Sequence, residues 1–235
     1  MDDNDPGSRI ALALDVPDLD AAKRLIDQTH ESVGTFKVGL ELYTAVGPAA
    51  IEAVHTAGAK CFLDLKLHDI PATMGRSVAR AASMDVAYLT VHGAAGLDAL
   101  RQASGEAGST QLLAVTVLTS LDAGALEQIG LCGGPRNAAD RLAKLAWDAG
   151  LRGFVTSAHE CAALRDTLGE EAFLVTPGIR PTGSDVGDQK RVMRPADAIE
   201  AGADLLVVGR PIRDADDPTQ AAAEIARQVE LALSQ

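Results

Sequence analysis

Short apolar runs alternate with longer alanine-rich amphipathic stretches along this 235-residue chain, and this alternation is the feature that most restricts its fold. The runs have the length and the Val, Ile and Leu content of strands buried on both faces. The strands that we expect are 10–14, 35–38, 60–65, 86–91, 112–118, 153–156, 173–176 and 204–208. The helices that we expect are 19–30, 49–56, 74–83, 96–102, 138–147, 160–168, 196–200 and 219–233.

Repeated strand–helix units without a break in composition predict one α/β domain with a parallel sheet. About eight such units favour a (β/α)8 TIM barrel. The alternative is a doubly wound open sheet, which would predict a glycine-rich phosphate-binding turn after the first strand. The residues at that point are Leu14-Asp15-Val16-Pro17, which do not match such a turn. We therefore expect a barrel domain over residues 9–235, preceded by a flexible acidic tail over residues 1–8.

The overall charge and the cysteines argue against several classes of protein. A formal net charge of -12 opposes non-specific binding to nucleic acid or to an anionic membrane. No apolar run is long enough to predict a transmembrane helix, and the acidic N-terminus lacks the pattern of a signal peptide. Cys61, Cys132 and Cys161 are too widely spaced to predict a disulfide framework or a zinc cluster. These features are typical of a cytoplasmic protein.

The segment Asp64-Leu65-Lys66-Leu67-His68-Asp69-Ile70-Pro71 places a lysine between two aspartates where an apolar strand ends. Because strand side chains alternate between faces, Asp64 and Lys66 are expected to point the same way. Burying charges is costly unless they are paired and hydrogen-bonded, so this array is a candidate site. A structural salt bridge at the end of a strand is the alternative explanation of a lone Asp-x-Lys pattern.

Further polar residues follow other predicted strands, and TIM-barrel active sites lie at the C-terminal ends of the barrel strands. Each of these residues could be an ordinary turn or capping residue, but their shared placement at one end of the barrel favours a site. They are Asp15, Lys37, Thr119, Ser120, Pro177, Arg180, Gly209 and Arg210.

The residues after the last two strands favour a phosphate site, because TIM barrels often bind phosphate with these loops. Gly209 allows close backbone approach, and the guanidinium groups of Arg180 and Arg210 can hold phosphate oxygens. The polar loop 181–189 contains two glycines and is predicted to close over a ligand. Solvated arginines and a disordered surface loop are the alternative interpretation.

In their order and spacing, these motifs resemble the bacterial type of the orotidine 5′-monophosphate decarboxylase family, and the resemblance covers nearly the whole chain. The matching segments are Leu12-Ala13-Leu14-Asp15, Phe36-Lys37-Val38-Gly39, Asp64 to Pro71, Leu118-Thr119-Ser120, Thr176-Pro177-Gly178-Ile179-Arg180, Gly187-Asp188-Gln189-Lys190-Arg191 and Val208-Gly209-Arg210-Pro211.

This resemblance implies removal of CO2 from orotidine 5′-monophosphate to give uridine 5′-monophosphate, the last step of de novo pyrimidine nucleotide synthesis. It implies that the reaction uses neither a metal nor an organic cofactor. Lys66 would protonate the carbanion-like ring carbon that loses CO2. Asp64 and Asp69 would flank this lysine, and Lys37 would complete the charged network.

The resemblance also implies a homodimer with shared active sites, in which Asp69, Ile70 and Thr73 reach into the site of the neighbouring subunit. Family members often carry Asn at the position of Ala72, which puts a local loop contact in doubt but not the chemistry. The resemblance also implies three further groups of substrate-binding residues. Asp15 and Lys37 would contact the ribose, and Thr119 and Ser120 would contact the base. The phosphate and its surroundings would be contacted by Pro177, Arg180, Gln189, Gly209 and Arg210.

The chemistry of the charged residues separates this interpretation from others. Carboxylates beside Lys66 favour a charged lysine, which can stabilise a carbanion and donate a proton, whereas an imine-forming aldolase needs a neutral amine. The nearest alternative is a Mg-dependent sugar-phosphate decarboxylase or aldolase of the same barrel suprafamily, which Lys37 opposes because Mg2+ requires oxygen ligands. A non-catalytic nucleotide-binding barrel and an acidic interaction scaffold are weaker alternatives. The roles of His68 and His92 stay open.

Overall fold

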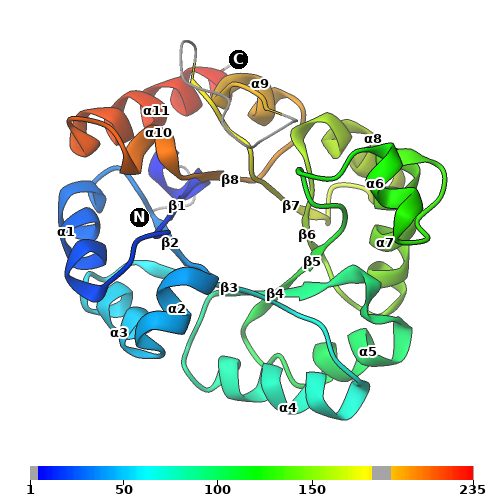
Figure 1. The fold of residues 1–235 in the computed structure, drawn as a ribbon. Coiled ribbons are helices and arrows are strands. Elements are labelled where there is room, and N and C mark those ends of the chain that lie inside the picture. The colour runs from blue at the N-terminus through cyan, green and yellow to red at the C-terminus, as the bar shows by residue number, and fades with distance from the viewer. Residues whose placement is uncertain (1–4, 182–191, 235) are drawn as a thin grey trace.

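The computed structural model describes residues 5–181 and 192–234, and within them eight parallel strands close into a barrel in the order of the sequence. Figure 1 looks down this barrel and shows the helices as a ring around the strands. The predicted (β/α)8 fold is therefore confirmed. The strands are β1 Ile10–Ala13, β2 Thr35–Val38, β3 Lys60–Leu67, β4 Tyr88–His92, β5 Gln111–Val115, β6 Gly153–Val155, β7 Phe173–Thr176 and β8 Leu205–Val208.

Helices follow the strands and cover the outside of the barrel, and each helix that the sequence predicts is present with small shifts at its ends (Figure 1). None of the helices described is long and apolar enough to cross a membrane. The α-helices are α1 Leu19–Thr29, α2 Leu40–Val46, α3 Ala49–Thr56, α4 Pro71–Ala82, α5 Leu97–Gly105, α6 Ala123–Gln128, α7 Gly134–Asp148, α8 Ala158–Leu168, α9 Pro195–Glu200, α10 Arg210–Arg213 and α11 Pro218–Leu233.

Three short helices, α2, α6 and α10, were not predicted from the sequence. They are too short to show a full amphipathic repeat, and they lie in the loops that follow β2, β5 and β8. The fifth strand was also predicted to continue to residue 118, but it ends at Val115. The apolar run continues because Val117 leaves the barrel and packs against Leu126 of α6 and Leu142 of α7.

The N-terminal segment begins with a 3-10 helix, η1, over Pro6–Arg9. Asp5 caps this turn, and the carbonyl of Gly7 accepts a hydrogen bond from the backbone N–H of Gly34 at 2.8 Å. The tail expected over residues 1–8 thus includes residues 5–8, which belong to the folded body. Residues 1–4 lie outside the part of the chain that the structure describes.

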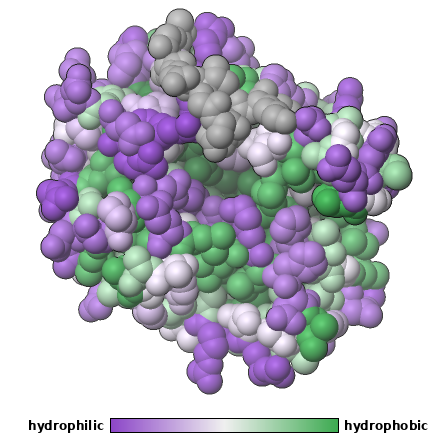
Figure 2. Space-filling model, viewed as in Figure 1, coloured by the Kyte–Doolittle hydropathy of each residue, from purple (hydrophilic) through white to green (hydrophobic). Residues whose placement is uncertain are grey.

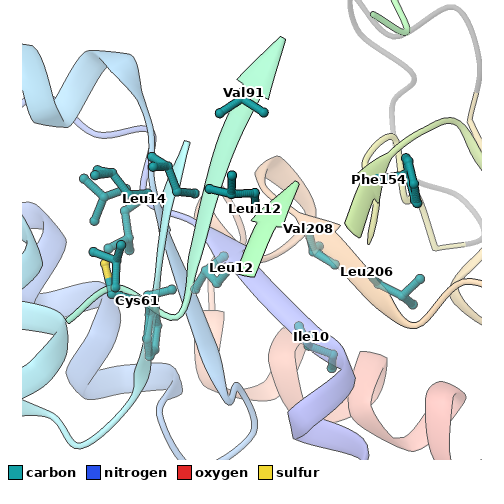
Figure 3. Packing of buried hydrophobic residues seen from close by; sticks show 14 of the residues in the cluster. Ile10, Leu12, Leu14, Cys61, Val91, Leu112, Phe154, Leu206 and Val208 are labelled. Carbon is teal, nitrogen blue, oxygen red and sulfur yellow. The ribbon is translucent and has the colours of Figure 1, made fainter. Parts of the chain in front are cut away.

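The alternating residues of each strand supply two separate cores. In β1, Ile10 and Leu12 point outward to the helices, whereas Ala11 and Ala13 point into the barrel. Figure 3 shows the outward set, with side chains from several strands gathered between the sheet and the helices. This double burial explains why the strands are continuous apolar runs rather than alternating ones.

Aromatic rings fill much of the barrel interior, although aromatic residues are scarce in the chain. The ring of Tyr88 lies between Phe62, at 6.0 Å in an edge-on arrangement, and Phe173, at 5.6 Å in a stacked one. Small residues on the inner face of β1, Ala11 and Ala13, leave room for these rings. The part of the barrel around these rings is therefore a packed core, and open space is left toward the C-terminal ends of the strands.

Gly153 in β6 tests how tightly this interior is packed. A methyl group added there would lie 2.5 Å from Leu113 Cδ2 and 2.6 Å from the backbone oxygen of Leu112. We predict that Gly153→Ala lowers the free energy of unfolding by about 1–3 kcal/mol, because the barrel wall must shift to admit the methyl group. The measurement is denaturant unfolding followed by circular dichroism.

Gly105→Ala, at the end of α5, is the matched control, because an added methyl group there meets no atom within 4 Å. That variant should be neutral or up to about 1 kcal/mol more stable, since alanine favours a helix more than glycine does. Equal stability of the two variants would show that the barrel interior has room to spare.

Candidate active site

A cavity of about 600 Å³ opens at the C-terminal ends of the strands. The space-filling view shows the molecular surface hollowed near the centre of this face, with hydrophobic and hydrophilic residues both around the hollow (Figure 2). Ten of the residues expected from strand ends and loops line this one cavity. They are Asp15, Lys37, Asp64, Lys66, Thr119, Ser120, Pro177, Arg180, Gly209 and Arg210.

Four of these residues form a chain of alternating charges across the cavity wall. Lys37 Nζ lies 3.1 Å from Asp15 Oδ1 and 3.3 Å from Asp64 Oδ2. The other carboxylate oxygen of Asp64, Oδ1, accepts a hydrogen bond from Lys66 Nζ at 2.8 Å. Asp64 thus lies between two ammonium groups, and each oxygen of its carboxylate contacts a different lysine.

Strand geometry points Lys37 and Asp64 into the cavity. Phe36 and Val38 of β2 pack in the outer core, so Lys37 between them faces the barrel interior. In β3, Leu63 likewise packs outward, and Asp64 faces inward. Both charged residues are buried, with exposed fractions of only 8% each, and they therefore depend on each other for compensation.

The charge state of this pair follows from its partners. Burial alone would lower the pKa of Lys37, but the charges of Asp64 and Asp15 outweigh it and hold the pKa above the usual lysine value. Burial would likewise raise the pKa of Asp64, but Lys37, Lys66 and a hydrogen bond from the Thr90 hydroxyl hold it below the usual value. Both groups are therefore charged at neutral pH.

Lys66 reaches Asp64 by a different backbone geometry from the simple alternation that the sequence predicted. The pairing of β3 with β4 shifts register between Leu63 and Leu67, and Lys66 adopts a left-handed conformation with a φ angle of 49°. A residue other than glycine in this region is strained by about 1–3 kcal/mol, and such strain concentrates at functional sites. The bulge re-aims the Lys66 side chain toward the cavity.

Thr90 in β4 holds this bulge in place, and sequence reasoning did not identify it. Its hydroxyl donates a hydrogen bond to Asp64 Oδ1 at 2.9 Å and accepts one from the backbone N–H of Lys66 at 2.9 Å. One buried hydroxyl therefore fixes both the anion and the backbone of the neighbouring cation. Its only signal in the sequence is a polar residue inside a strand that is otherwise apolar.

Gly39, directly after β2, is a second residue that sequence reasoning quoted only as part of a motif. A methyl group at this position would lie 2.9 Å from both Asp15 Oδ1 and Lys37 Nζ. The ion pair between Asp15 and Lys37 therefore occupies space that only glycine leaves free at this position.

The opposite side of the cavity is formed by the residues after β7 and β8. Arg180 is buried, its Nη1 donates to the carbonyl of Ile179 at 2.8 Å, and its backbone N–H bonds the carbonyl of Met193 at 2.9 Å. Gly209 precedes α10, whose first residue is Arg210, so the last strand leads directly into this helix. The predicted lid over residues 181–189, including Gln189, lies outside the described residues except for Pro181.

Three expected site residues after β3, two on the following loop and one in α4, do not line the cavity. Asp69 is exposed, and its Oδ1 accepts a hydrogen bond from the backbone N–H of Ile70 at 2.7 Å. Ile70 is 68% exposed, and Thr73 lies in a separate groove beside α4. Within one described chain, Lys66 therefore pairs with Asp64 but not with Asp69.

The imidazole rings of His68 and His92 stack beside Lys66, with centroids 5.3 Å apart. Burial lowers the pKa of His92, and the nearby His68 and Lys66 lower it further, so its ring is neutral at neutral pH. This arrangement indicates a packing role against the loop that carries Asp69.

Among the residues described, no group of three or more His, Cys, Asp or Glu side chains is arranged to hold a metal ion. In the cavity wall, the two carboxylates that face each other, Asp15 and Asp64, are bridged by the ammonium group of Lys37. A lysine thus fills the position between these oxygens that a cation would need.

Comparisons with known proteins point to the same family. A family model described as "Orotidine 5'-phosphate decarboxylase / HUMPS family" matches residues 8–225. The orotidine 5'-phosphate decarboxylase of Anaeromyxobacter sp. (strain K) is 51% identical over 222 residues, which cover 94% of this chain and 98% of that protein. The corresponding protein of Thermobifida fusca (strain YX) is 50% identical over 222 residues, covering 94% and 95%.

The fold agrees as well. The crystal structure of orotidine 5'-phosphate decarboxylase from Lactobacillus acidophilus superposes with a TM-score of 0.82 at 32% identity, covering 94% of this chain and 98% of that one.

Replacement of Thr90 tests the hydrogen bonds at the bulge. We predict that Thr90→Val lowers the free energy of unfolding at neutral pH by about 1–3 kcal/mol, because the Lys66 N–H loses its acceptor and Asp64 loses a donor. The Thr90 hydroxyl helps to lower the pKa of Asp64. This part of the effect is therefore present above the ordinary carboxyl pKa and is lost as the pH falls through the lowered pKa of Asp64.

The measurement is denaturant unfolding of wild type and variant from neutral to acidic pH. Thr110→Val is the matched control, because the buried Thr110 hydroxyl donates only to the carbonyl of Val86, at 2.9 Å. Its effect should not change over the same pH range. If the effect of Thr90→Val were equally independent of pH, the hydroxyl would not be supporting the Asp64 charge.

Proposed function

The chain belongs to the orotidine 5'-phosphate decarboxylase / HUMPS family, and we propose that it converts orotidine 5′-monophosphate to uridine 5′-monophosphate and CO2 in the cavity at the barrel mouth. Relatives that are 50–51% identical over nearly their whole length carry the decarboxylase name. The observation that carries the proposal is the alternating array of Asp15, Lys37, Asp64 and Lys66 on the wall of one cavity.

The charged array separates decarboxylation from the alternative that the sequence leaves open, a Mg-dependent reaction of sugar phosphates in the same kind of barrel. A Mg-dependent reaction of sugar phosphates needs oxygen ligands that are free to bind the ion. Here Asp15 and Asp64 are both paired with Lys37. The array therefore favours decarboxylation over the metal-dependent alternative, in agreement with the names of the relatives.

Lys66 is the proposed proton donor. When the bond between the orotate ring and its carboxylate breaks, CO2 leaves and the bonding electron pair stays on the ring carbon. The ammonium group of Lys66 stabilises this negative charge and then transfers a proton to the carbon, which completes the product. Lys66 afterwards regains a proton from solvent. The side chain of Lys66 is 30% exposed, so it can meet both the substrate and water.

Asp64 and Lys37 hold the ammonium group of Lys66 in place for this step. Asp64 orients the ammonium group through the 2.8 Å hydrogen bond, and Lys37 compensates the second oxygen of Asp64. Because these charges are already in place before the substrate arrives, little reorganisation is needed during the reaction.

The rest of the cavity suits the two ends of the nucleotide. Asp15 and Lys37 are the proposed contacts of the ribose hydroxyls. Thr119 and Ser120 are the proposed contacts of the pyrimidine. Across the cavity, Gly209 and the two arginines provide a backbone approach and positive charge for the phosphate. The phosphate-side set is Pro177, Arg180, Gly209 and Arg210 of the cavity wall, with Gln189 proposed from the sequence alone.

We further propose that the active enzyme is a homodimer with shared sites. Ile70 is 68% and Leu40 is 56% exposed, which is unusual for large apolar side chains beside an active site. A groove of about 370 Å³ close by is lined by Leu63, Leu65, Leu67 and Thr73, among others. A second copy that covers this surface would bring its Asp69 to Lys66. A location in the cytoplasm likewise stays a prediction.

Replacement of Lys66 tests the proton donor. We predict that Lys66→Ala folds but loses turnover by roughly 10²–10⁴-fold or more, because the general acid is absent. Turnover is measured as loss of the orotate-ring absorbance together with chromatographic detection of uridine 5′-monophosphate. Lys144→Ala is the matched control, since Lys144 forms an exposed ion pair with Asp140 on α7, outside the cavity. Substantial turnover by Lys66→Ala would overturn the assignment.

The same assay separates the metal-dependent alternative. Wild-type enzyme that has been treated with a chelator and dialysed should keep its full rate on orotidine 5′-monophosphate. A rate that falls and returns on addition of Mg2+ would contradict the proposed chemistry.

Mixing two inactive variants tests the shared sites. Lys66→Ala and Asp69→Ala should each be inactive alone. If Asp69 serves the partner's site, mixed dimers contain one intact site, and random exchange restores roughly a quarter of the wild-type activity. Lys66→Ala mixed with Asp64→Asn is the control and should restore nothing, because both residues lie in the same chain's site. No recovery in the first mixture would show that each chain works alone.

A further inference from the structure

Arg213, the last residue of α10, lies on the cavity wall but was not expected there from the sequence. Its Nη1 donates a hydrogen bond to the backbone carbonyl of Asp15 at 3.0 Å. Its Nε and Nη2 donate to the two carboxylate oxygens of the next residue, Asp214, at 2.6 and 2.8 Å. Each nitrogen of the guanidinium group therefore has a partner within the protein.

These partners distinguish Arg213 from an arginine that waits for an anion. The bidentate pair with Asp214 balances its charge and fixes the plane of the guanidinium group. The side chain is only 23% exposed. Three of the five N–H groups of Arg213 are used in these bonds, and Asp214 already balances the charge, so the geometry favours a bracing role over direct contact with the substrate.

The brace joins two parts of the cavity that bind opposite ends of the proposed substrate. At one end, α10 begins with Arg210, on the phosphate side. At the other, Asp15 is held twice: Arg213 holds its backbone carbonyl, and Lys37 donates to its side chain at 3.1 Å. The strands β1 and β8, which precede Asp15 and Arg213, are paired neighbours in the barrel. Asp15 and Arg213 themselves lie beyond the last paired residues, Leu12 and Val208. Arg213 extends the connection into this region.

We propose that Arg213 is a positioning residue that fixes Asp15 against α10, so that the phosphate-binding turn and the Asp15–Lys37–Asp64–Lys66 array form one rigid unit. The inference rests on the proposed function, because it assumes a substrate that is held at both ends. Reaction rates depend steeply on such alignment, and a displacement of about 1 Å can cost roughly 10²-fold.

The experiment compares kcat and KM of Arg213→Ala and Arg213→Lys with those of wild type on orotidine 5′-monophosphate. Arg213→Ala should lose roughly 10–100-fold in kcat/KM, with kcat affected as well as KM. Arg213→Lys should recover part of this loss, since a lysine can reach the carbonyl but cannot form the fork with Asp214. Arg227→Ala is the matched control, because Arg227 forms the same kind of fork with Glu224 on α11, outside the cavity. It should match wild type.

A double-mutant cycle shows whether Arg213 acts through Asp15. In an Asp15→Ala background, Arg213→Ala should cost less than about 3-fold further, because the side chain that Arg213 positions is gone. The same full loss of kcat/KM in both backgrounds would overturn the proposal. So would an Arg213→Ala variant whose kcat/KM equals that of the control Arg227→Ala. A loss confined to KM, with kcat unchanged, would show instead that Arg213 only binds the phosphate. Absence of turnover in wild type and in Arg227→Ala alike would refute the proposed function and not the brace.

Discussion

The structure of the site depends on one buried carboxylate shared by two lysines. Asp64 contacts Lys37 with one oxygen and Lys66 with the other, at 3.3 and 2.8 Å. Removal of either ammonium group would leave a buried charge without full compensation, which is far more costly than loss of a surface ion pair. The interaction therefore holds the pKa of Lys37 above its usual value and the pKa of Asp64 below its usual value. The same interaction holds Lys66 at the cavity, where the proposed reaction would develop negative charge.

The barrel supports this interaction at several levels. Strand alternation turns Lys37 and Asp64 inward, and aromatic packing fills the barrel below them, so the charges lie on the wall of an open cavity. The bulge at Lys66 and the Thr90 hydroxyl then supply what regular strand geometry lacks. The strained conformation of Lys66 persists because Thr90 and Asp64 hold it from both sides.

Membership of the orotidine 5'-phosphate decarboxylase / HUMPS family suggests one explanation for these interactions, which is the binding of a nucleotide. A nucleotide has a phosphate at one end and a reacting ring at the other, and the cavity offers arginines on one side and the charged array on the other. The proposed brace at Arg213 would hold the two sides at a constant separation. The exposed Ile70 and the position of Asp69 suit a site that a second copy completes.

The sequence by itself determined the barrel, because continuous apolar runs spaced by amphipathic helices fit few other folds, and it identified ten residues of the cavity wall from their places after the strands. Only the tertiary structure revealed the bulge at Lys66, the hydroxyl of Thr90, the space left by Gly39 and the hydrogen bond from Arg213 to the Asp15 carbonyl. The physical reason is the separation along the chain of the residues that interact. Periodicity and turn chemistry act between near neighbours and leave a local pattern, whereas these contacts join residues far apart in the chain, whose approach the closed barrel alone sets.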